Sequence, residues 1–508
     1  MIGKQERQKG LFCYGVNLEK RVPNNHPLRA IKRALDLSFV RASVAGFYGH
    51  NGNVSVAPEI IVKLMVLLFL DDIPGERELL RMLPYRLDYL WFLDYGLDSE
   101  VPDHSVLSKA RRRWGPPLFQ SLFVQSVEQC VSAGLVDGRK LYVDGSLVDA
   151  NASKDSVQRG SPELLAALSA VYRKEEQKLE ELSEPAPGDG PNPKGGEGSS
   201  GSGSSTPGGY TPVNNTLLCK TDPDAAIVRH GSLSPRPRYK SHRGVDDRCG
   251  VVVAVETTSG DVSENHKLFD LVEESERNTG VEVATVVGDC QYGTVENFRK
   301  CIELGIKPHM GDFADKARRG HKLKSGIFGE ERFVYDASRD VYVCPAGQLL
   351  KRRHHKPLRR AWYYGCSAKL CGACSLQTQC TRAQTGRTVI RHEGQELVDA
   401  ARAVSRSYAA KQDRKRRKWK MEGSFADAAN NHGFKRSRWR GLKWQKVQDW
   451  LIALCQNIRI LVSHRLPDRA GAVIQTAKCA FADPFVPGRH KISRIFERLT
   501  FWEPIFGI

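Results

Sequence analysis

The hydrophobic pattern of this chain changes at Lys140, and that change restricts the possible folds more than any other feature. Before Lys140, apolar residues recur at helical spacing, as Ile61, Met65 and Leu68 do. From Lys140 onward, β-branched and aromatic residues form short runs bounded by glycine, which is typical of strands. The pattern predicts an all-helical domain over residues 1–135, followed by a mixed sheet with helices, an α+β or α/β arrangement.

The rest of the chain divides by composition. Residues 136–310 alternate strand-like and helical stretches and predict the first part of a sheet-containing core. Within them, residues 183–216 are rich in Gly, Ser and Pro, a composition that predicts a disordered insertion. Residues 311–395 are basic and cysteine-rich and predict a small inserted unit. Residues 396–463 return to helical spacing and complete the core, and residues 464–508 form a C-terminal tail to which we assign no role beyond the surface.

Net charge indicates the class of partner. The chain has 508 residues, enough for roughly three domains. Its 77 Lys and Arg residues outnumber 58 Asp and Glu residues, which gives a formal charge of +19. Such an excess favours a polyanion, because each phosphate that a basic side chain neutralises releases condensed counterions. Nucleic acid is therefore the first partner to consider.

Two segments bear on the compartment. The apolar run at residues 60–70 is interrupted by Lys63 and is shorter than the roughly 20 residues that span a bilayer. The amino terminus, MIGKQERQKG, lacks the apolar core of a secretory signal. We therefore expect a cytoplasmic, nucleoid-associated protein with no membrane partner, whose 13 cysteines are reduced.

Two acidic residues follow strand-like runs in the same way. Asp144 comes after Tyr142-Val143, and Asp289 comes after a valine-rich run that ends in glycine. Carboxylates at neighbouring strand ends can share hard cations such as Mg²⁺ or Mn²⁺, which phosphodiester chemistry requires. The alternative is that each aspartate only caps a turn.

A third acid, Glu422, lies in a basic region. Nine Lys or Arg residues fall within residues 401–420, and aromatic residues such as Trp419 and Phe425 are interleaved with the basic ones or follow them. These rings can stack on bases or pack in the core, and a run of charge is often only a solvated face. A second basic stretch, at residues 109–113, follows a predicted helix cap in the amino-terminal region. Together the basic regions give the candidate DNA-binding residues Lys109, Arg111, Arg112, Arg113, Arg414, Arg416, Arg417, Lys418, Lys435 and Arg436.

Ordered blocks of sequence resemble the DDE transposases of bacterial insertion sequences, in the subgroup with a helical amino-terminal domain and a cysteine-containing insertion. The blocks include VAPEIIVKLMVLLFL, PDHSVLSKARRRWG, YVDGSLVDANAS, TDPDA, VVGDCQYGTVEN and MEGSFADAANNHGF. The resemblance covers roughly residues 18–461. It implies an RNase H-like fold, similar to retroviral integrase, with Asp144 on the first strand, Asp289 on the fourth and Glu422 on a late helix.

The same resemblance implies a function. The three acids would be the catalytic residues and the ligands of Mg²⁺ or Mn²⁺. The reaction would be cleavage at the ends of the element and strand transfer into target DNA. The implied partners are double-stranded DNA, as terminal inverted repeats and as target, and a second copy of the chain in a homodimer on DNA.

Two positions depart from such relatives. A Lys or Arg commonly follows the glutamate by two helical turns, where this chain has Ala428 and Ala429, so Lys435 or Arg436 is a candidate substitute. The tyrosine that some relatives carry two helical turns before the glutamate is missing here, since its position lies in the basic residues 414–418. The alternative function is therefore a catalytically inactive or domesticated DNA-binding descendant, and a nuclease without joining activity is a third.

The cysteines of the inserted unit predict a local metal site. Five of them lie within residues 344–380, including one CxxC pair. Such spacing fits a tetrahedral structural Zn²⁺, with His354, His355 and Cys366 as alternates, while reduced thiols without metal are the other possibility. The predicted zinc ligands are Cys344, Cys371, Cys374 and Cys380.

Overall fold

The structure is a computed structural model that describes residues 16–49, 54–181, 217–229, 231, 234–312 and 326–465. The predicted insertion at 183–216 lies outside the described residues, as does the chain beyond residue 465. The described residues combine helices with sheets, which confirms the mixed class expected from the change of pattern. No helix in this described part is both long and apolar enough to cross a membrane.

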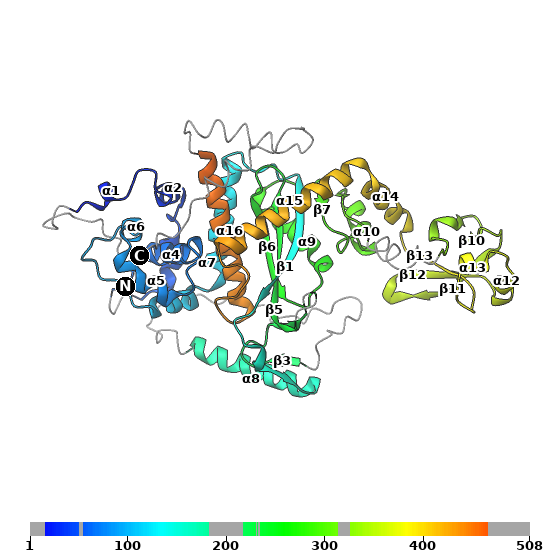
Figure 1. Cartoon of the computed structure of the whole chain (residues 1–508), viewed down its shortest axis with the longest axis horizontal. Coiled ribbons are helices and arrows are strands. Elements are labelled where there is room, and N and C mark those ends of the chain that lie inside the picture. The colour runs from blue at the N-terminus through cyan, green and yellow to red at the C-terminus, as the bar shows by residue number, and fades with distance from the viewer. Residues whose placement is uncertain are drawn as a thin grey trace, which may run out of the picture.

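The described chain before the main sheet is helical (Figure 1). The carboxylate of Asp103 accepts the backbone N–H of Ser105 at 2.8 Å and so caps the longest helix of this region, as the sequence predicts. That helix bends at Gly115, whose φ of +67° favours glycine, just before two prolines. The α-helices are α1 (Leu18–Arg21), α2 (Pro27–Ala34), α3 (Val40–Val44), α4 (Pro58–Leu70), α5 (Glu76–Met82), α6 (Leu87–Phe92) and α7 (Ser105–Ser132).

The main sheet has the strand order β6-β5-β1-β7-β8. Strand β1 runs antiparallel to β5 and parallel to β7, and β4 extends the outer edge of β5. Nearby, β2 (Val157–Arg159) pairs with β3 (Leu217–Cys219), and α8 (Pro162–Glu181) lies between them in sequence. The strands of the main sheet are β1 (Lys140–Asp149), β4 (Ala226–Val228), β5 (Arg236–Asp246), β6 (Val252–Ser259), β7 (Thr285–Val287) and β8 (Lys307–Pro308).

Strand β5 is not evident from the hydrophobic pattern, because polar residues occupy its buried centre. Ser241, His242 and Arg243 are fully buried. The Arg243 guanidinium donates to Gln456 Oε1 at 2.8 Å, and His242 Nε2 lies 2.9 Å from Thr258 Oγ1. These side-chain partners replace part of the water that the polar groups would otherwise bind, whereas His242 Nδ1 and Arg243 Nε and Nη2 have no hydrogen-bond partner among the described residues.

Helices cover both the sheet and the helical region. The predicted apolar face of the last described helix is buried, as expected, from Val447 to Leu461. Its opposite side is buried too, since the helix packs on β6 and also on α7, α4 and α2. It begins where Asp222 and Asp224 accept the N–H groups of Gly441 and Leu442, which gives the TDPDA block a capping role. The covering helices are α9 (Leu268–Thr279), α10 (Val295–Glu303), α14 (Gln395–Arg406), α15 (Tyr408–Asn431) and α16 (Leu442–Arg465).

The inserted unit forms a second sheet, at the end of the molecule away from the helical region (Figure 1). It is antiparallel throughout, with the order β13-β12-β11-β10-β9. Phe333, Tyr342, Leu350 and Tyr364 give it a small core of its own. Its elements are β9 (Val334–Asp336), β10 (Val341–Val343), β11 (Leu349–Lys356), β12 (Ala361–Gly365), α12 (Ala368–Gly372), α13 (Gln377–Cys380) and β13 (Thr388–His392).

Candidate active site

The register of two parallel strands brings Asp144 and Asp289 to the same level. Tyr142 of β1 is paired with Val287 of β7, and each aspartate stands two residues further along. Neighbouring strands are about 4.8 Å apart, so the two carboxylates come from adjacent positions. Strand β7 ends at Val287, whereas β1 continues past Asp144 to Asp149, because β5 pairs with it along that whole length. Asp144 is thus in mid-strand and not at the strand end that the sequence suggested.

Helix α15 crosses this point and supplies a cation to it. Arg417 Nη1 lies 2.7 Å from Asp144 Oδ2. One turn earlier, Asp413 accepts from Lys140 Nζ at 3.0 Å and lies 2.7 Å from His309 Nδ1, which anchors the helix across β1 and the end of β8. Burial raises the pKa of Asp144, Arg417 opposes that rise, and the charge of Asp289 adds to it.

A further carboxylate, Glu264, approaches the same position from the other side. It begins the short 3-10 helix η4 (Glu264–Lys267) between β6 and α9. A Cβ built on Gly145 would stand 2.8 Å from Glu264 Cγ and 3.0 Å from Glu264 Oε1, so the carboxyl group lies directly over that glycine. The pKa of Glu264 is raised to about 7, chiefly by burial and also by the charges of Asp144 and Asp289, against the effects of Lys240 and Arg417.

Tyr292, in the loop after Asp289, completes the surroundings. Its side chain is fully buried, and its hydroxyl has no hydrogen-bond partner within the described part of the chain. Burial raises its pKa, and the charges of Glu264, Asp144 and Asp289 raise it further. Neither Glu264 nor Tyr292 was found from the sequence, because Glu264 follows no strand-end pattern and Tyr292 is one apolar-type residue among many.

Glu422 lies on α15, five residues after Arg417, and is exposed. At about 100° per residue, its side chain leaves the helix roughly 140° away from the direction in which Arg417 reaches Asp144. The structure therefore brings Asp144 and Asp289 together and holds Glu422 on the covering helix, facing solvent. Among the described residues, no three His, Cys, Asp or Glu side chains are grouped so that they could hold a metal ion as they stand.

The donor types nevertheless suit a hard cation. Asp144, Asp289 and Glu264 offer carboxylate oxygens, which are the ligands that Mg²⁺ and Mn²⁺ prefer. Their mutual repulsion is partly balanced by the guanidinium of Arg417, which stands at the place where a divalent cation would balance it instead. The site therefore combines suitable ligands with a protein cation that a metal would have to displace.

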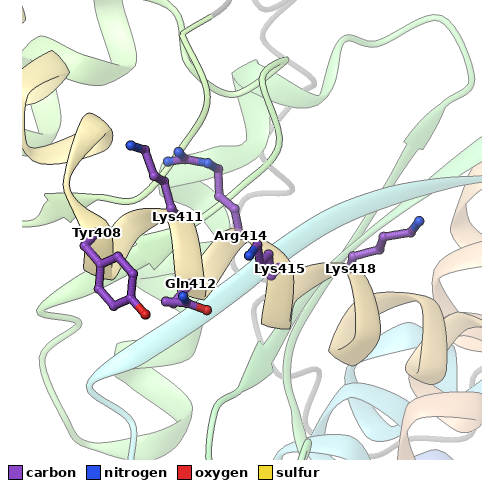
Figure 2. Close-up of a pocket in the computed structure, with 6 residues that line it drawn as sticks. All are labelled: Tyr408, Lys411, Gln412, Arg414, Lys415 and Lys418. Carbon is purple, nitrogen blue, oxygen red and sulfur yellow. The ribbon is translucent and has the colours of Figure 1, made fainter. Parts of the chain in front are cut away.

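Basic side chains line the exposed side of α15. Figure 2 shows a shallow pocket formed by Tyr408, Lys411, Gln412, Arg414, Lys415 and Lys418. Arg416 and Lys418 are exposed, whereas Arg414 donates to the backbone oxygen of Ser405 at 2.7 Å. Downstream, Lys435 and Arg436 are exposed as well. Lys435 Nζ donates to Ser146 Oγ at 2.9 Å, and Ser146 is on the same face of β1 as Asp144, which places this lysine beside the acids.

The predicted basic helix of the amino-terminal region is only partly available to DNA. Lys109 and Arg112 are exposed, and Arg113 is half-buried with its guanidinium over Tyr48. Arg111 is buried, pairs with Glu76 and stacks on Trp439 at 4.0 Å. Arg111 is therefore corrected from a DNA contact to a residue that joins the helical region to the chain segment before α16, because its side chain is buried against Glu76 and Trp439.

The thiols of the second sheet lie near one another. Cys344, Cys371 and Cys380 pack against the same small core, and burial raises the pKa of Cys380. The four predicted zinc ligands do not form a group that could hold a metal ion within the described part of the chain, so the zinc site stays a prediction. The alternates on β11 have other contacts, since His354 stacks on Tyr363 and His355 packs on Trp362.

Comparisons with known families give two matches. Residues 16–113 match the family described as Transposase domain (DUF772), and residues 343–462 match the family described as Transposase DDE domain. Asp144, Asp289 and Glu264 lie between these two segments, and Glu422 lies within the second. No curated protein and no solved structure matches the chain. Together, the two matches support a DDE transposase of the insertion-sequence type.

Proposed function

We propose that this chain cuts the ends of its own DNA element and joins them to target DNA by a metal-dependent reaction. The observation that carries the proposal is the position of Asp144 on β1 and of Asp289 in the loop directly after β7, two residues beyond the last pair of these parallel strands. The order β6-β5-β1-β7-β8, with β5 antiparallel to its neighbours, supports an RNase H-like core for the sheet. Two transposase family matches on either side of this core support the same function.

In this proposal Asp144 and Asp289 hold divalent cations, and Glu422 is the third acid. When bound, Mg²⁺ or Mn²⁺ activates the attacking oxygen and stabilises the leaving one. A cation held by Asp144 would take the place of Arg417, whose guanidinium would then be available to a DNA phosphate. Because Glu422 faces solvent in the structure, it reaches the aspartates only if α15 rotates or shifts as DNA binds.

DNA would be held by the exposed basic side chains around this centre. Lys415, Arg416 and Lys418 lie on the solvent side of α15, and Lys435 lies beside β1. A DNA backbone bound to these side chains would pass close to Asp144. The residues that bind its phosphates would therefore also determine which phosphodiester bond lies at the acids and is cut. We propose that Lys435 takes the place of the basic residue that relatives carry after the glutamate. A homodimer on DNA, with one copy for each element end, completes the proposal.

One observation favours the alternative, an inactive DNA-binding descendant. Arg417 neutralises Asp144 while Glu422 faces solvent, so the structure does not bring the three acids together. The two functions differ in one respect only, which is whether the acids assemble once DNA and metal are both present.

Cleavage and gel-shift assays on the element's own ends separate them. We expect Asp144→Asn and Glu422→Gln to bind DNA as tightly as the wild type, or more tightly, because a negative charge is removed. Their Mg²⁺-dependent cleavage should fall by several powers of ten. Asp155→Asn, at an exposed aspartate on the 3-10 helix after β1, is the control and should cleave normally. Binding without cleavage by every protein, the wild type included, would establish the inactive descendant.

A further inference from the structure

We propose that Glu264 is an additional carboxylate ligand of the divalent cation held by Asp144 and Asp289. The inference rests on the proposed function, because it concerns the same site. It adds a residue from the turn between β6 and α9 to acids that otherwise come from β1, the end of β7 and α15.

The strands leave an opening through which Glu264 can join the aspartates. Side chains alternate along β1, so Asp144 points to the α15 side and Gly145 to the opposite side. Strand β7 pairs with β1 only as far as Tyr142, so the β1 edge at Asp144 and Gly145 has no β7 neighbour. Carboxylates from the two faces of the sheet and from the loop after β7 can therefore meet at this edge.

Gly145 provides the space for this approach. Its φ lies in the ordinary region, so its backbone does not require glycine. What requires it is Glu264, since a Cβ at this position would stand 2.8 Å from Cγ and 2.9 Å from Cδ of that side chain. The Glu264 carboxyl group thus occupies the space that a side chain at position 145, next to Asp144, would fill.

The partners that Glu264 has within the protein do not account for its position. Lys240 Nζ lies 3.9 Å from Glu264 Oε1, which is long for an ion pair, and the same ammonium donates to the backbone oxygen of Val262 at 2.9 Å. The charge of Arg417 acts on Glu264 as it does on Asp144, although the two acids lie on opposite faces.

Tyr292 is an independent sign of a ligand here. Its hydroxyl is fully buried among Glu264, Asp144 and Asp289 and has no hydrogen-bond partner in the described chain. A buried hydroxyl without a partner is destabilising, so such groups usually have one. The Asn297 side chain donates to the backbone oxygens of both Tyr292 and Asn265, at 2.9 and 3.0 Å, and so fixes the tyrosine loop against the turn that carries Glu264.

The test is direct measurement of Mn²⁺ binding to the full chain by calorimetry, without DNA and without an activity readout. We expect Glu264→Gln to weaken Mn²⁺ binding by about tenfold or more, because a ligand oxygen loses its charge. Gly145→Ala should weaken it in the same direction without changing any charge, because the new Cβ displaces the Glu264 side chain. Glu273→Gln, at an exposed position on α9, is the matched control and should bind as the wild type does.

Two aspartate variants separate the possible failures. If Asp144→Asn and Asp289→Asn abolish Mn²⁺ binding while Glu264→Gln and Gly145→Ala leave it unchanged, the role of Glu264 is refuted and the proposed function stands. If none of the four variants changes Mn²⁺ binding, the proposed function fails together with the inference. Circular dichroism of each variant excludes loss of folding as the cause of weaker binding.

Discussion

Replacing Arg417 with glutamine removes the guanidinium beside Asp144 and keeps a polar side chain of similar length. Loss of one partner from a fully buried ion pair costs about 3–5 kcal/mol. The Asp144 side chain is 24% exposed and that of Arg417 is 16% exposed, so water screens the carboxylate that is left behind. We therefore expect a loss of about 1–2 kcal/mol in the free energy of unfolding when no divalent cation is present.

The same change should strengthen cation binding. In the wild type a divalent ion must displace Arg417 from Asp144, whereas in Arg417→Gln the carboxylate is free. A ligand that binds only the folded state stabilises it in proportion to the logarithm of its concentration over Kd. Added Mn²⁺ should therefore raise the melting temperature of Arg417→Gln by more than it raises that of the wild type.

Thermal unfolding in EDTA and in a Mn²⁺ series measures both effects. In EDTA the midpoint of Arg417→Gln should fall by roughly 1 °C for each kcal/mol lost, because a chain of 508 residues has a large entropy of unfolding. Arg416→Gln, which changes an exposed neighbour on α15, should melt as the wild type does in both conditions. Equal midpoints for Arg417→Gln and the wild type in EDTA, or an equal response of both to Mn²⁺, would refute the idea that Arg417 stands in for a metal ion.

Three further outcomes are expected. Lys418→Ala should lower the slope of log affinity for DNA against log salt by about one, because one phosphate contact is lost. Arg111→Ala should lower the melting temperature and leave that slope unchanged, because Arg111 is buried and paired with Glu76. Equal slopes for Lys418→Ala and the wild type would argue against DNA binding along α15. Elemental analysis of purified protein should find about one zinc ion per chain, and Cys374→Ser should release it; a preparation without zinc would leave the thiols structural. Burial raises the pKa of Glu274 to about 8, from an ordinary value of 4.5, so the folded state holds a proton that the unfolded chain loses. Stability should therefore fall as the pH rises from about 4.5 to about 8, by up to roughly 1.4 kcal/mol per unit, and Glu274→Gln should flatten this fall as measured by urea unfolding at several pH values; an unchanged pH profile would show that Glu274 titrates normally.

Local patterns predicted the parts of the fold and site that depend on local sequence. The valine-rich run before Asp289 and the Tyr142-Val143 pair before Asp144 both belong to buried strands, so the two acids could be matched before their register was known, although β1 continues past Asp144. The apolar face of α16 was predicted for the same reason. Its burial on both sides could not be predicted, since it depends on contacts with α7 and α4, which come from distant sequence.

The parts that were missed depend on tertiary partners. Arg111 and Arg112 are adjacent and identical in type, yet only Arg111 is buried, because Glu76 and Trp439 are brought to it by folding. Glu264 is one acid among many in the sequence, and only the open position at Gly145 singles it out. The strand β5 was missed because its buried residues are polar, and partners such as Thr258 and Gln456 come from other elements that no local pattern reveals.

Exchange of Asp289 for cysteine tests most directly whether the paired aspartates hold the catalytic metal. A thiolate is a poor ligand for Mg²⁺ and a better one for softer divalent ions, so a change of ligand should change the metal that supports cleavage. We predict that Asp289→Cys loses cleavage of the element ends in Mg²⁺ and regains part of it in Mn²⁺, while Asp155→Cys cleaves as the wild type does with either ion. Cleavage by Asp289→Cys in Mg²⁺ at the wild-type rate would contradict the assignment of Asp289 as a metal ligand.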